Sequence, residues 1–335
     1  MASGLLSLQP HKVSRDLSGY ITYIYGAGKT GKTTLASQMD RALLVAFERG
    51  YNAIPGIIAK DITSWGQFKK EVVKELRDEE VKAAFKCIVI DTIDIAADLC
   101  EKYICSQNGV EKLTEIPWGG GWKLWKKEIE ETFRAITQMG YALFFISHAK
   151  EKTFKREDGY EYNQIIPSLA STPNEVIKNM ADIYGYAHQV RDENGVVSVK
   201  LTLRSQDGSV DTGCRFKYID PEIDFTYQAL TNALNSAIDR ESQEHNGQFV
   251  TDERTQTIDN PTVDFYALRD EFNVLVGKIQ AVAGARFGTD WAPRITFIVE
   301  KYIGKGKKAS DLTPAQAEQL LLIVDDLKEA VGQGI

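Results

Sequence analysis

A glycine-rich run at residues 26–33, Gly-Ala-Gly-Lys-Thr-Gly-Lys-Thr, constrains the fold of this chain more than any other segment. An alternating, strand-like run at 20–25 precedes it, and a helix-compatible stretch at 34–39 follows it. Strand, glycine loop and helix in this order form a phosphate-binding loop, in which backbone N–H groups surround a nucleoside triphosphate. The residues expected to bind ATP are Gly26, Ala27, Gly28, Lys29, Thr30, Gly31, Lys32, Thr33 and Thr34.

Two side chains of this loop have specific expected roles. Lys32 is expected to reach the β and γ phosphates and to act in catalysis, and the Thr33 hydroxyl to occupy one coordination position of Mg²⁺. ATP and Mg²⁺ are therefore the expected cofactors. A chance glycine turn is the alternative, and the flanking strand and helix argue against it.

The segment at 87–91, Cys-Ile-Val-Ile-Asp, is typical of an apolar strand that ends in a carboxylate. In an α/β sheet, ligands collect at the carboxyl ends of the strands, so Asp91 is expected to face the Mg²⁺. Thr92 follows Asp91, whereas many ring-forming motor ATPases place a water-activating Glu there. A carboxylate base, if there is one, therefore has to come from another strand.

Two further strand ends supply catalytic candidates. Glu48 follows an apolar, strand-like run and is expected to orient or deprotonate the attacking water; a surface charge paired with Arg49 is the alternative. The apolar run at 141–146 ends in Ser147 and His148, a polar pair expected to hydrogen-bond the γ-phosphate and report its presence to the following loop. A purely structural histidine is the alternative for His148.

Strand-like and helix-like segments alternate over residues 17–238, which predicts an α/β core with a mainly parallel sheet. Beyond the first strand, we expect strands at 42–48, 86–92, 141–147, 183–190 and 196–205, and helices at 64–78, 92–106, 121–139 and 172–182. A flexible leader is expected at 1–16, a polar linker at 239–262 and a small helical domain at 263–335.

Composition limits the class of protein. The hydrophobic share of 43% and the charged share of 26% are ordinary for a soluble globular chain, and no apolar run approaches the roughly 18 residues of a membrane span. The beginning of the chain lacks a basic leading region, and the four cysteines lack metal-ligand spacing, so a reducing cytoplasm is expected. The net charge of −7 neither indicates nor excludes nucleic-acid binding, which depends on local basic patches.

The order of these motifs resembles that of bacteriophage RecA-like P-loop ATPases, the AAA-type NTP-binding relatives of RecA proposed to act as single-strand annealing or strand-exchange recombinases. The resemblance covers roughly residues 18–230. It rests on the phosphate loop, Glu48, Asp91-Thr92, Ser147-His148, the Ile-Pro-Ser-Leu run at 166–169, and Ala181-Asp182. It implies a RecA-like core in which Glu48 is the catalytic glutamate and Ser147-His148 is the sensor. The chain differs from RecA itself in lacking a glutamine at the sensor.

The resemblance also implies two DNA-contacting loops at the carboxyl edge of the sheet. In the first, at 107–122, glycines would give a mobile loop and Trp118 would stack on unpaired bases; anchoring of Trp122 to the core is the alternative for that residue. The second loop combines four cations with aromatic rings, Phe154 and then Tyr160 and Tyr162, which suits phosphate tracking and base stacking, although a plain exposed hairpin is the alternative. Its expected DNA-binding residues are Lys150, Lys152, Phe154, Lys155 and Arg156.

RecA-like assemblies complete the γ-phosphate site with a cation from a neighbouring subunit. Arg215 best fits this role, with an ordinary surface arginine as the alternative. The resemblance thus implies a homo-oligomer, a filament or ring on single-stranded DNA, in the cytoplasm of a bacterial host and without membrane contact. A single-strand-binding protein, or another replication or recombination protein, is a further expected partner.

The motifs and the resemblance together imply a DNA-stimulated ATPase that binds single-stranded DNA and acts as a recombinase or annealing protein. Three alternatives stay open: a P-loop motor, helicase or helicase loader; a small-molecule kinase; and a protein in which ATP only switches assembly. A dedicated water-activating Glu48 argues against the kinase.

Overall fold

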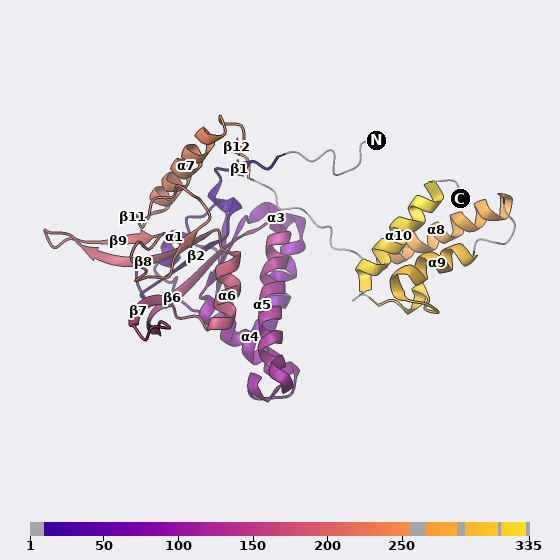
Figure 1. Ribbon diagram of the computed structural model, residues 1–335, viewed down its shortest axis with the longest axis horizontal. Helices are drawn as coiled ribbons and strands as arrows, with labels where there is room; N and C mark the ends of the chain where they lie inside the picture. The colour runs from indigo at the N-terminus through magenta and orange to yellow at the C-terminus, as the bar shows by residue number, and fades with distance from the viewer. Residues whose placement is uncertain (1–9, 255–264, 287–291, 314–315, 333–335) are drawn as a thin grey trace. The chain divides into compact units, whose positions relative to one another are not determined.

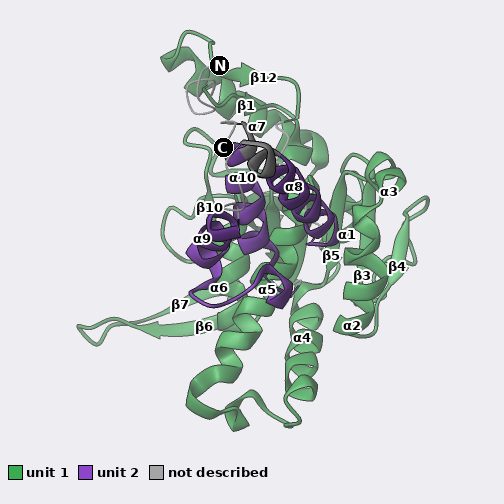
Figure 2. Ribbon diagram, turned by 90° about the vertical axis from the view of Figure 1, so that its right-hand side faces the viewer, with its two compact units in different colours: residues 1–259 green, residues 260–335 purple. Residues whose placement is uncertain are grey.

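The computed structural model describes residues 10–254, 265–286, 292–313 and 316–332. The chain divides into two compact units, residues 1–259 and 260–335, which Figure 2 shows in different colours. Unit 1 contains the phosphate-binding loop, and unit 2 is helical.

Unit 1 is built around a central sheet whose inner strands are parallel (Figure 1). In spatial order these strands are β8 (Ile183–Arg191), β2 (Thr22–Gly26), β6 (Ala142–Lys155), β5 (Cys87–Asp91), β3 (Ala42–Ala46) and β4 (Ala59–Asp61). Strand β6 therefore separates the phosphate-loop strand β2 from β5, which ends in Asp91. Because β2, β6, β5 and β3 are parallel, their carboxyl ends lie along one edge of the sheet. This architecture confirms the expected α/β fold class.

Antiparallel strands extend this sheet beyond β8 and also form a hairpin on β6. The strands at the β8 end are β9 (Val197–Thr202), β10 (Gly213–Cys214) and β11 (Glu222–Asp224). Strand β7 (Glu161–Pro167) pairs with the outer half of β6. Figure 2 shows this β6–β7 hairpin projecting from the body of unit 1.

Helices cover both faces of the sheet, because successive strand residues point to opposite sides. On β2, Tyr23 and Tyr25 pack in one apolar cluster and Ile24 packs in the other. The first face carries α2 (Trp65–Phe68), α3 (Glu79–Ala84), α4 (Ile93–Gln107), α5 (Gly120–Gln138) and α6 (Ser171–Met180), and the second carries α1 (Lys32–Ala36) and α7 (Tyr227–Glu244). Short 3₁₀ or π turns occur at Leu17–Gly19, Lys69–Val73, Glu75–Arg77, Leu113–Glu115 and Pro117–Gly119.

The two ends of unit 1 differ from the expected leader and linker. Strand β1 (Val13–Ser14) lies inside the expected leader and pairs with β12 (Val250–Thr251), which lies inside the expected linker. Helix α7 also continues to Glu244, past the expected start of the linker at 239. The last turns of α7 are polar because they are exposed, yet ion pairs such as Lys217–Glu244, at 3.0 Å, fix them to the body of the unit. The rest of the expected linker, 255–262, lies outside the described residues.

The described residues of unit 2 form three helices, α8 (Phe265–Arg286), α9 (Ala292–Ile303) and α10 (Ala317–Gly332), and a 3₁₀ turn at Ala309–Asp311. Their apolar side chains meet in one cluster, in which Ile323, Val324 and Leu327 of α10 are fully buried. Among the described residues of both units, no helix combines the length and the apolar character that crossing a membrane requires.

Candidate functional site

The phosphate-binding loop connects β2 to α1 and depends on its glycines at two positions. Gly31 adopts a left-handed conformation with φ of 88° directly before α1. A Cβ on Gly26 would lie 2.3 Å from the backbone oxygen of Ala187 on the neighbouring strand β8, so any side chain there would clash. Glycine is therefore required at both ends of the loop for different reasons, conformational freedom at one and close backbone approach at the other.

Lys32 is held inside the loop. Its Nζ donates to the backbone oxygens of Gly26 and Ala27, at 2.9 and 2.7 Å. Burial lowers the pKa of Lys32, and the nearby carboxylates of Asp91, Asp94 and Glu48 oppose this shift. A triphosphate bound to the loop would supply anionic oxygens that the buried ammonium prefers to neutral carbonyls. The position therefore suits the expected contact with the β and γ phosphates.

Thr33 and Asp91 place two oxygens side by side. The Thr33 hydroxyl donates to Oδ2 of Asp91 at 2.8 Å, and Asp91 is buried at the end of β5. Burial raises the pKa of Asp91, an effect that the hydrogen bond from Thr33 opposes. A hydroxyl and a carboxylate are hard oxygen ligands of the kind that Mg²⁺ takes from a protein, with phosphates and water completing its shell. These two residues therefore fit the implied Mg²⁺, although the described residues contain no cluster of three or more His, Cys, Asp or Glu side chains that could hold a metal by themselves.

Glu48 and His148 face each other across a cavity of about 520 Å³ that the phosphate loop also lines. Oε2 of Glu48 lies 3.4 Å from Nε2 of His148, and both side chains are about half exposed. Arg49, the alternative partner of Glu48, instead forms an ion pair with Asp61 at 3.0 Å. Glu48 is thus directed into the nucleotide cavity, as its expected role requires.

Ser147 does not lie where the sequence interpretation placed it. Its hydroxyl donates to Oδ1 of Asp94 at 3.0 Å, and the residue is fully buried between β6 and α4. Side chains alternate along a strand, so Ser147 and His148 point to opposite faces of β6 and only His148 lines the cavity. Direct contact of Ser147 with the γ-phosphate is therefore corrected. Ser147 instead shares Asp94 with the hydroxyl of Ser168, which follows β7.

The expected second DNA loop is a regular β-hairpin. Strand β6 continues without a break to Lys155, and Lys152, Phe154 and Lys155 pair in register with residues of β7. Lys150 donates from Nζ to the backbone oxygen of Ser168 at 2.8 Å. The hairpin is the conformation that the sequence analysis gave as the alternative, and Lys150, Lys152 and Phe154 alternate along it with residues that face the other side.

In the expected first DNA loop, Trp118 is 98% exposed, and three glycines follow it directly. They begin helix α5: Gly119 has φ of 66°, and a Cβ on Gly121 would lie 2.3 Å from the backbone oxygen of Leu113. Trp122 is less exposed and packs its ring 5.8 Å from that of Trp125. The segment presents one free indole on a turn.

Arg215 lies far from the phosphate loop of its own chain. It follows β10, which pairs with the first residues of β8, whereas the phosphate loop lies at the other end of the adjacent strand β2. The Arg215 guanidinium forms an ion pair with Asp182 at 3.1 Å and donates to the backbone oxygen of Asn179 at 2.9 Å. Arg215 could therefore reach a γ-phosphate only in a neighbouring copy, and this ion pair would have to open first.

The sequence interpretation did not anticipate the cavities of unit 1 that lie beside the phosphate loop and beside α7. One, of about 760 Å³, adjoins the phosphate loop at Gly28 and Thr30 and is lined by Tyr186 and His188, whose rings stack at 5.1 Å. The alternation of Tyr184, Tyr186 and His188 along β8 was the available signal.

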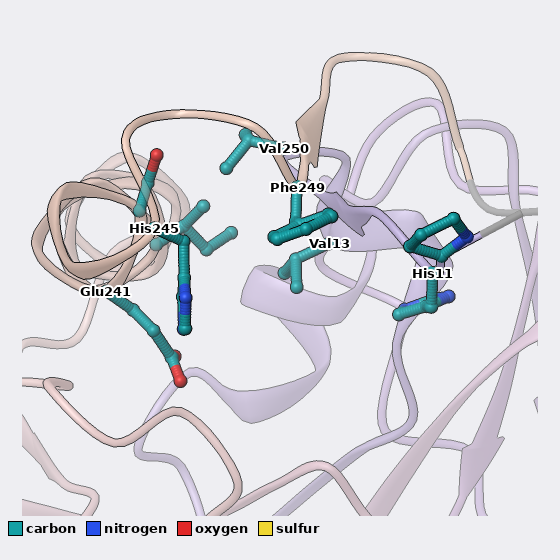
Figure 3. A pocket seen from close by; sticks show the side chains of 9 residues that line it. His11, Val13, Glu241, His245, Phe249 and Val250 are labelled. Atoms are coloured by element: carbon teal, nitrogen blue, oxygen red, sulfur yellow. The ribbon is translucent and has the colours of Figure 1, made fainter.

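The other cavity, of about 300 Å³, lies between α7 and the N-terminal segment, as Figure 3 shows. Its described lining is mostly apolar and includes Val13, His245 and Phe249, and it contains no Lys or Arg that could bind phosphate. We therefore place the nucleotide at the phosphate loop.

Comparison with known proteins agrees with this site. A family model described as an AAA domain matches residues 18–221, more than half of the chain, and this range includes every phosphate-loop residue. The chain is also 28% identical over 343 aligned residues to YorG, an uncharacterized protein derived from the SPbeta prophage of Bacillus subtilis (strain 168). That alignment covers 99% of this chain and all of the relative.

Proposed function

The chain belongs to the AAA domain family, and from this premise we propose that it is an ATP-hydrolysing, single-stranded DNA-binding protein of phage type that promotes annealing or strand exchange. Family membership makes it a P-loop NTPase. The prophage origin of a relative supports the phage context. Beyond the activity of a P-loop NTPase, we propose that the protein binds single-stranded DNA as a second ligand.

The proposed hydrolysis uses side chains around the nucleotide cavity. Glu48 would take a proton from a water molecule, whose oxygen attacks the γ-phosphorus while the bond to the β–γ bridging oxygen breaks, giving ADP and phosphate. Lys32 would neutralise charge that develops on the phosphate oxygens. Thr33 and Asp91 would hold Mg²⁺, which would supply further charge neutralisation to the phosphates. His148, 3.4 Å from Glu48, would orient that carboxylate.

One observation carries the DNA part of the proposal: the strand that lines the nucleotide cavity is also the strand that forms the basic hairpin. β6 runs from Ala142, inside the sheet, to Lys155. Its residue His148 faces the cavity, and Lys150 and Lys152 follow at once on the exposed part. A rigid element that touches both sites can transmit a nucleotide-dependent shift to the hairpin.

Assembly into a homo-oligomeric filament or ring, in the cytoplasm of a bacterial host, is part of the same proposal. Arg215 supports it, because its side chain is 61% exposed and cannot serve the site of its own chain. A single-strand-binding protein is the proposed further partner, since such proteins occupy the same DNA.

ATP hydrolysis measured with and without an unstructured DNA strand tests the proposal, together with annealing of complementary strands and electron microscopy of the same samples. We expect Mg²⁺-dependent hydrolysis that single strands stimulate, ordered assemblies on DNA, and accelerated annealing. Lys32→Ala is the matched negative control, because it removes the cation from the loop. Hydrolysis at the wild-type rate by Lys32→Ala would overturn the site, and translocation or duplex unwinding without annealing would replace the recombinase by a motor.

A further inference from the structure

The β6–β7 hairpin has two chemically different faces, because alternate residues of a strand point to opposite sides. Register assigns Lys152 opposite Gln164 and Phe154 opposite Tyr162, so these four residues share a face. We call this the basic face, and its members are Lys150, Lys152, Phe154, Arg156, Tyr160, Tyr162 and Gln164. It contains three cations, three rings and no carboxylate.

Cations and rings alternate along the basic face. The rings of Phe154 and Tyr162 stack at 5.7 Å with an angle of 24° between their planes. Lys152 lies 5.0 Å from the centroid of Phe154, and Arg156 lies 5.3 Å from Tyr162 and 5.4 Å from Tyr160. An exposed cation thus lies over each of the two stacked rings, and Tyr160 is itself 60% exposed.

The opposite face of the hairpin is not basic. It carries Glu151, Thr153, Lys155, Glu161 and Asn163. Lys155 is paired with Glu161 at 3.6 Å, and the Thr153 hydroxyl donates to Asn163 at 2.8 Å. With two carboxylates and one ammonium, this face would repel a phosphate backbone.

We infer that single-stranded nucleic acid lies along the basic face alone, with its phosphates at Lys150, Lys152 and Arg156 and its unpaired bases on Phe154, Tyr160 and Tyr162. This inference rests on the proposed function and narrows it. It keeps Tyr160 and Tyr162, which the sequence already places in this segment, and removes Lys155 from the expected DNA-binding residues. As phosphates draw Lys152 and Arg156 away from the rings, the ring faces become free for bases. Duplex DNA, whose bases are already stacked on each other, cannot use them.

Lys152 and Lys155 form a matched pair for the test, since they lie three residues apart on the same strand but on opposite faces. The measurement is fluorescence anisotropy of an unstructured, labelled single strand across a salt series, using the full-length chain. For Lys152→Gln we expect weaker binding and a salt slope lower by about 0.7, the value for one lost single-strand phosphate contact. For Lys155→Gln we expect the wild-type affinity and slope.

The rings are tested separately from the charges. Phe154→Leu and Tyr162→Leu keep apolar volume but remove the ring, and each should weaken binding by roughly ten-fold with little change in the salt slope. Duplex of the same sequence should bind more weakly than the single strand and should not respond to the ring variants. DNA and RNA strands of the same sequence are compared directly, because both carry the bases and phosphates that this face recognises.

The outcomes separate this inference from the function on which it rests. If the wild-type chain binds no single strand, the proposed function itself fails. If it binds, but Lys155→Gln loses as much affinity and slope as Lys152→Gln, the assignment to one face is wrong while the proposed function stands. DNA-free ATP hydrolysis and the thermal melting midpoint of each variant should match the wild type, since all four side chains lie outside the nucleotide cavity.

Discussion

Glu48 and Asp91 are both carboxylates at strand ends, but they occupy different environments. Glu48 is about half exposed and faces His148, whereas Asp91 is buried and accepts the hydrogen bond of Thr33. We therefore expect Glu48→Gln to bind Mg²⁺-ATP with near wild-type affinity and to hydrolyse it at least about 100-fold more slowly, the usual effect of losing a general base. Single-turnover hydrolysis and nucleotide-binding titrations distinguish the two quantities. Full hydrolysis by Glu48→Gln would assign the base to another residue.

Asp91 gives a prediction for pH because burial raises its pKa. Because the pKa of Asp91 is higher in the folded state than in the unfolded chain, the folded state binds a proton more readily. The free energy of unfolding therefore falls as the pH rises from the usual pKa of aspartate through the raised pKa of Asp91. Asp91→Asn removes this penalty and keeps an oxygen for Thr33. The nucleotide-free variant should thus melt above the wild type at pH 7, and the difference should vanish below the usual pKa of aspartate. Mg²⁺ with a non-hydrolysable ATP analogue should stabilise the wild type but not the variant. If the nucleotide-free variant melts below the wild type at pH 7, the charged Asp91 carboxylate does not destabilise the folded state.

The place of a site residue could be predicted from the sequence where it depends on position along a strand, but not where it depends on which face of the strand the side chain occupies. Glu48, Asp91 and His148 lie at the carboxyl edge, as strand ends in a parallel sheet must. Ser147 was assigned to the same site as His148, although a step of one residue reverses the side of a strand, and Lys155 for the same reason faces away from Phe154. The register that shows this depends on pairing partners distant in the sequence, which no local pattern contains.

At the scale of elements, the start of α5 depends on a close contact at Gly121. Its Cα faces the backbone of Leu113, whose oxygen would lie 2.3 Å from an added Cβ, and backbone atoms cannot move aside cheaply. We expect Gly121→Ala to lower the free energy of unfolding by about 1–3 kcal/mol, as overpacking does. The control is Gly66→Ala in α2, where an added Cβ meets nothing within 4 Å and should raise that free energy by about 0.5–1 kcal/mol. Urea unfolding measures the free energy of unfolding of both variants. If the two substitutions change it equally, helix propensity and not the contact with Leu113 determines the effect at Gly121.

Elements with a strong apolar pattern could be predicted, and those stabilised by exposed polar contacts could not. β5 and the buried half of β6 are uninterrupted apolar runs and occur where the sequence predicts them. The outer half of β6 and the end of α7 are polar, so their composition suggested a loop and a linker. Cross-strand pairing with β7 and the Lys217–Glu244 ion pair stabilise these two segments, and both involve residues far from them in the sequence.

At the scale of the whole molecule, the end of unit 1 is defined by the segment after α7, which contacts β1 and the edge of the central sheet. After α7 the chain forms β12 against β1, and the half-buried guanidinium of Arg254 donates to the backbone oxygens of Gly140 and Lys86, beside the amino ends of β6 and β5. Burial lowers the pKa of Arg254, which indicates how far its charge is withdrawn from water. The core therefore extends beyond residue 238, the end that the sequence predicts, and includes every described residue up to Arg254.

Two truncations follow from this boundary. A chain ending at residue 259 keeps all of these contacts, so it should retain ATP hydrolysis and melt at the same midpoint as unit 1 in the full chain. A chain ending at residue 238 loses the last turns of α7, β12 and Arg254, and should melt lower or fail to fold. Arg254→Leu in the full chain removes only the contacts of this side chain. We expect it to lower the free energy of unfolding of unit 1 by about 1.5–3 kcal/mol, because the backbone oxygens of Gly140 and Lys86 lose a charged donor. Equal melting midpoints for the two truncations would show that the segment after residue 238 adds nothing to unit 1, and would restore the shorter core.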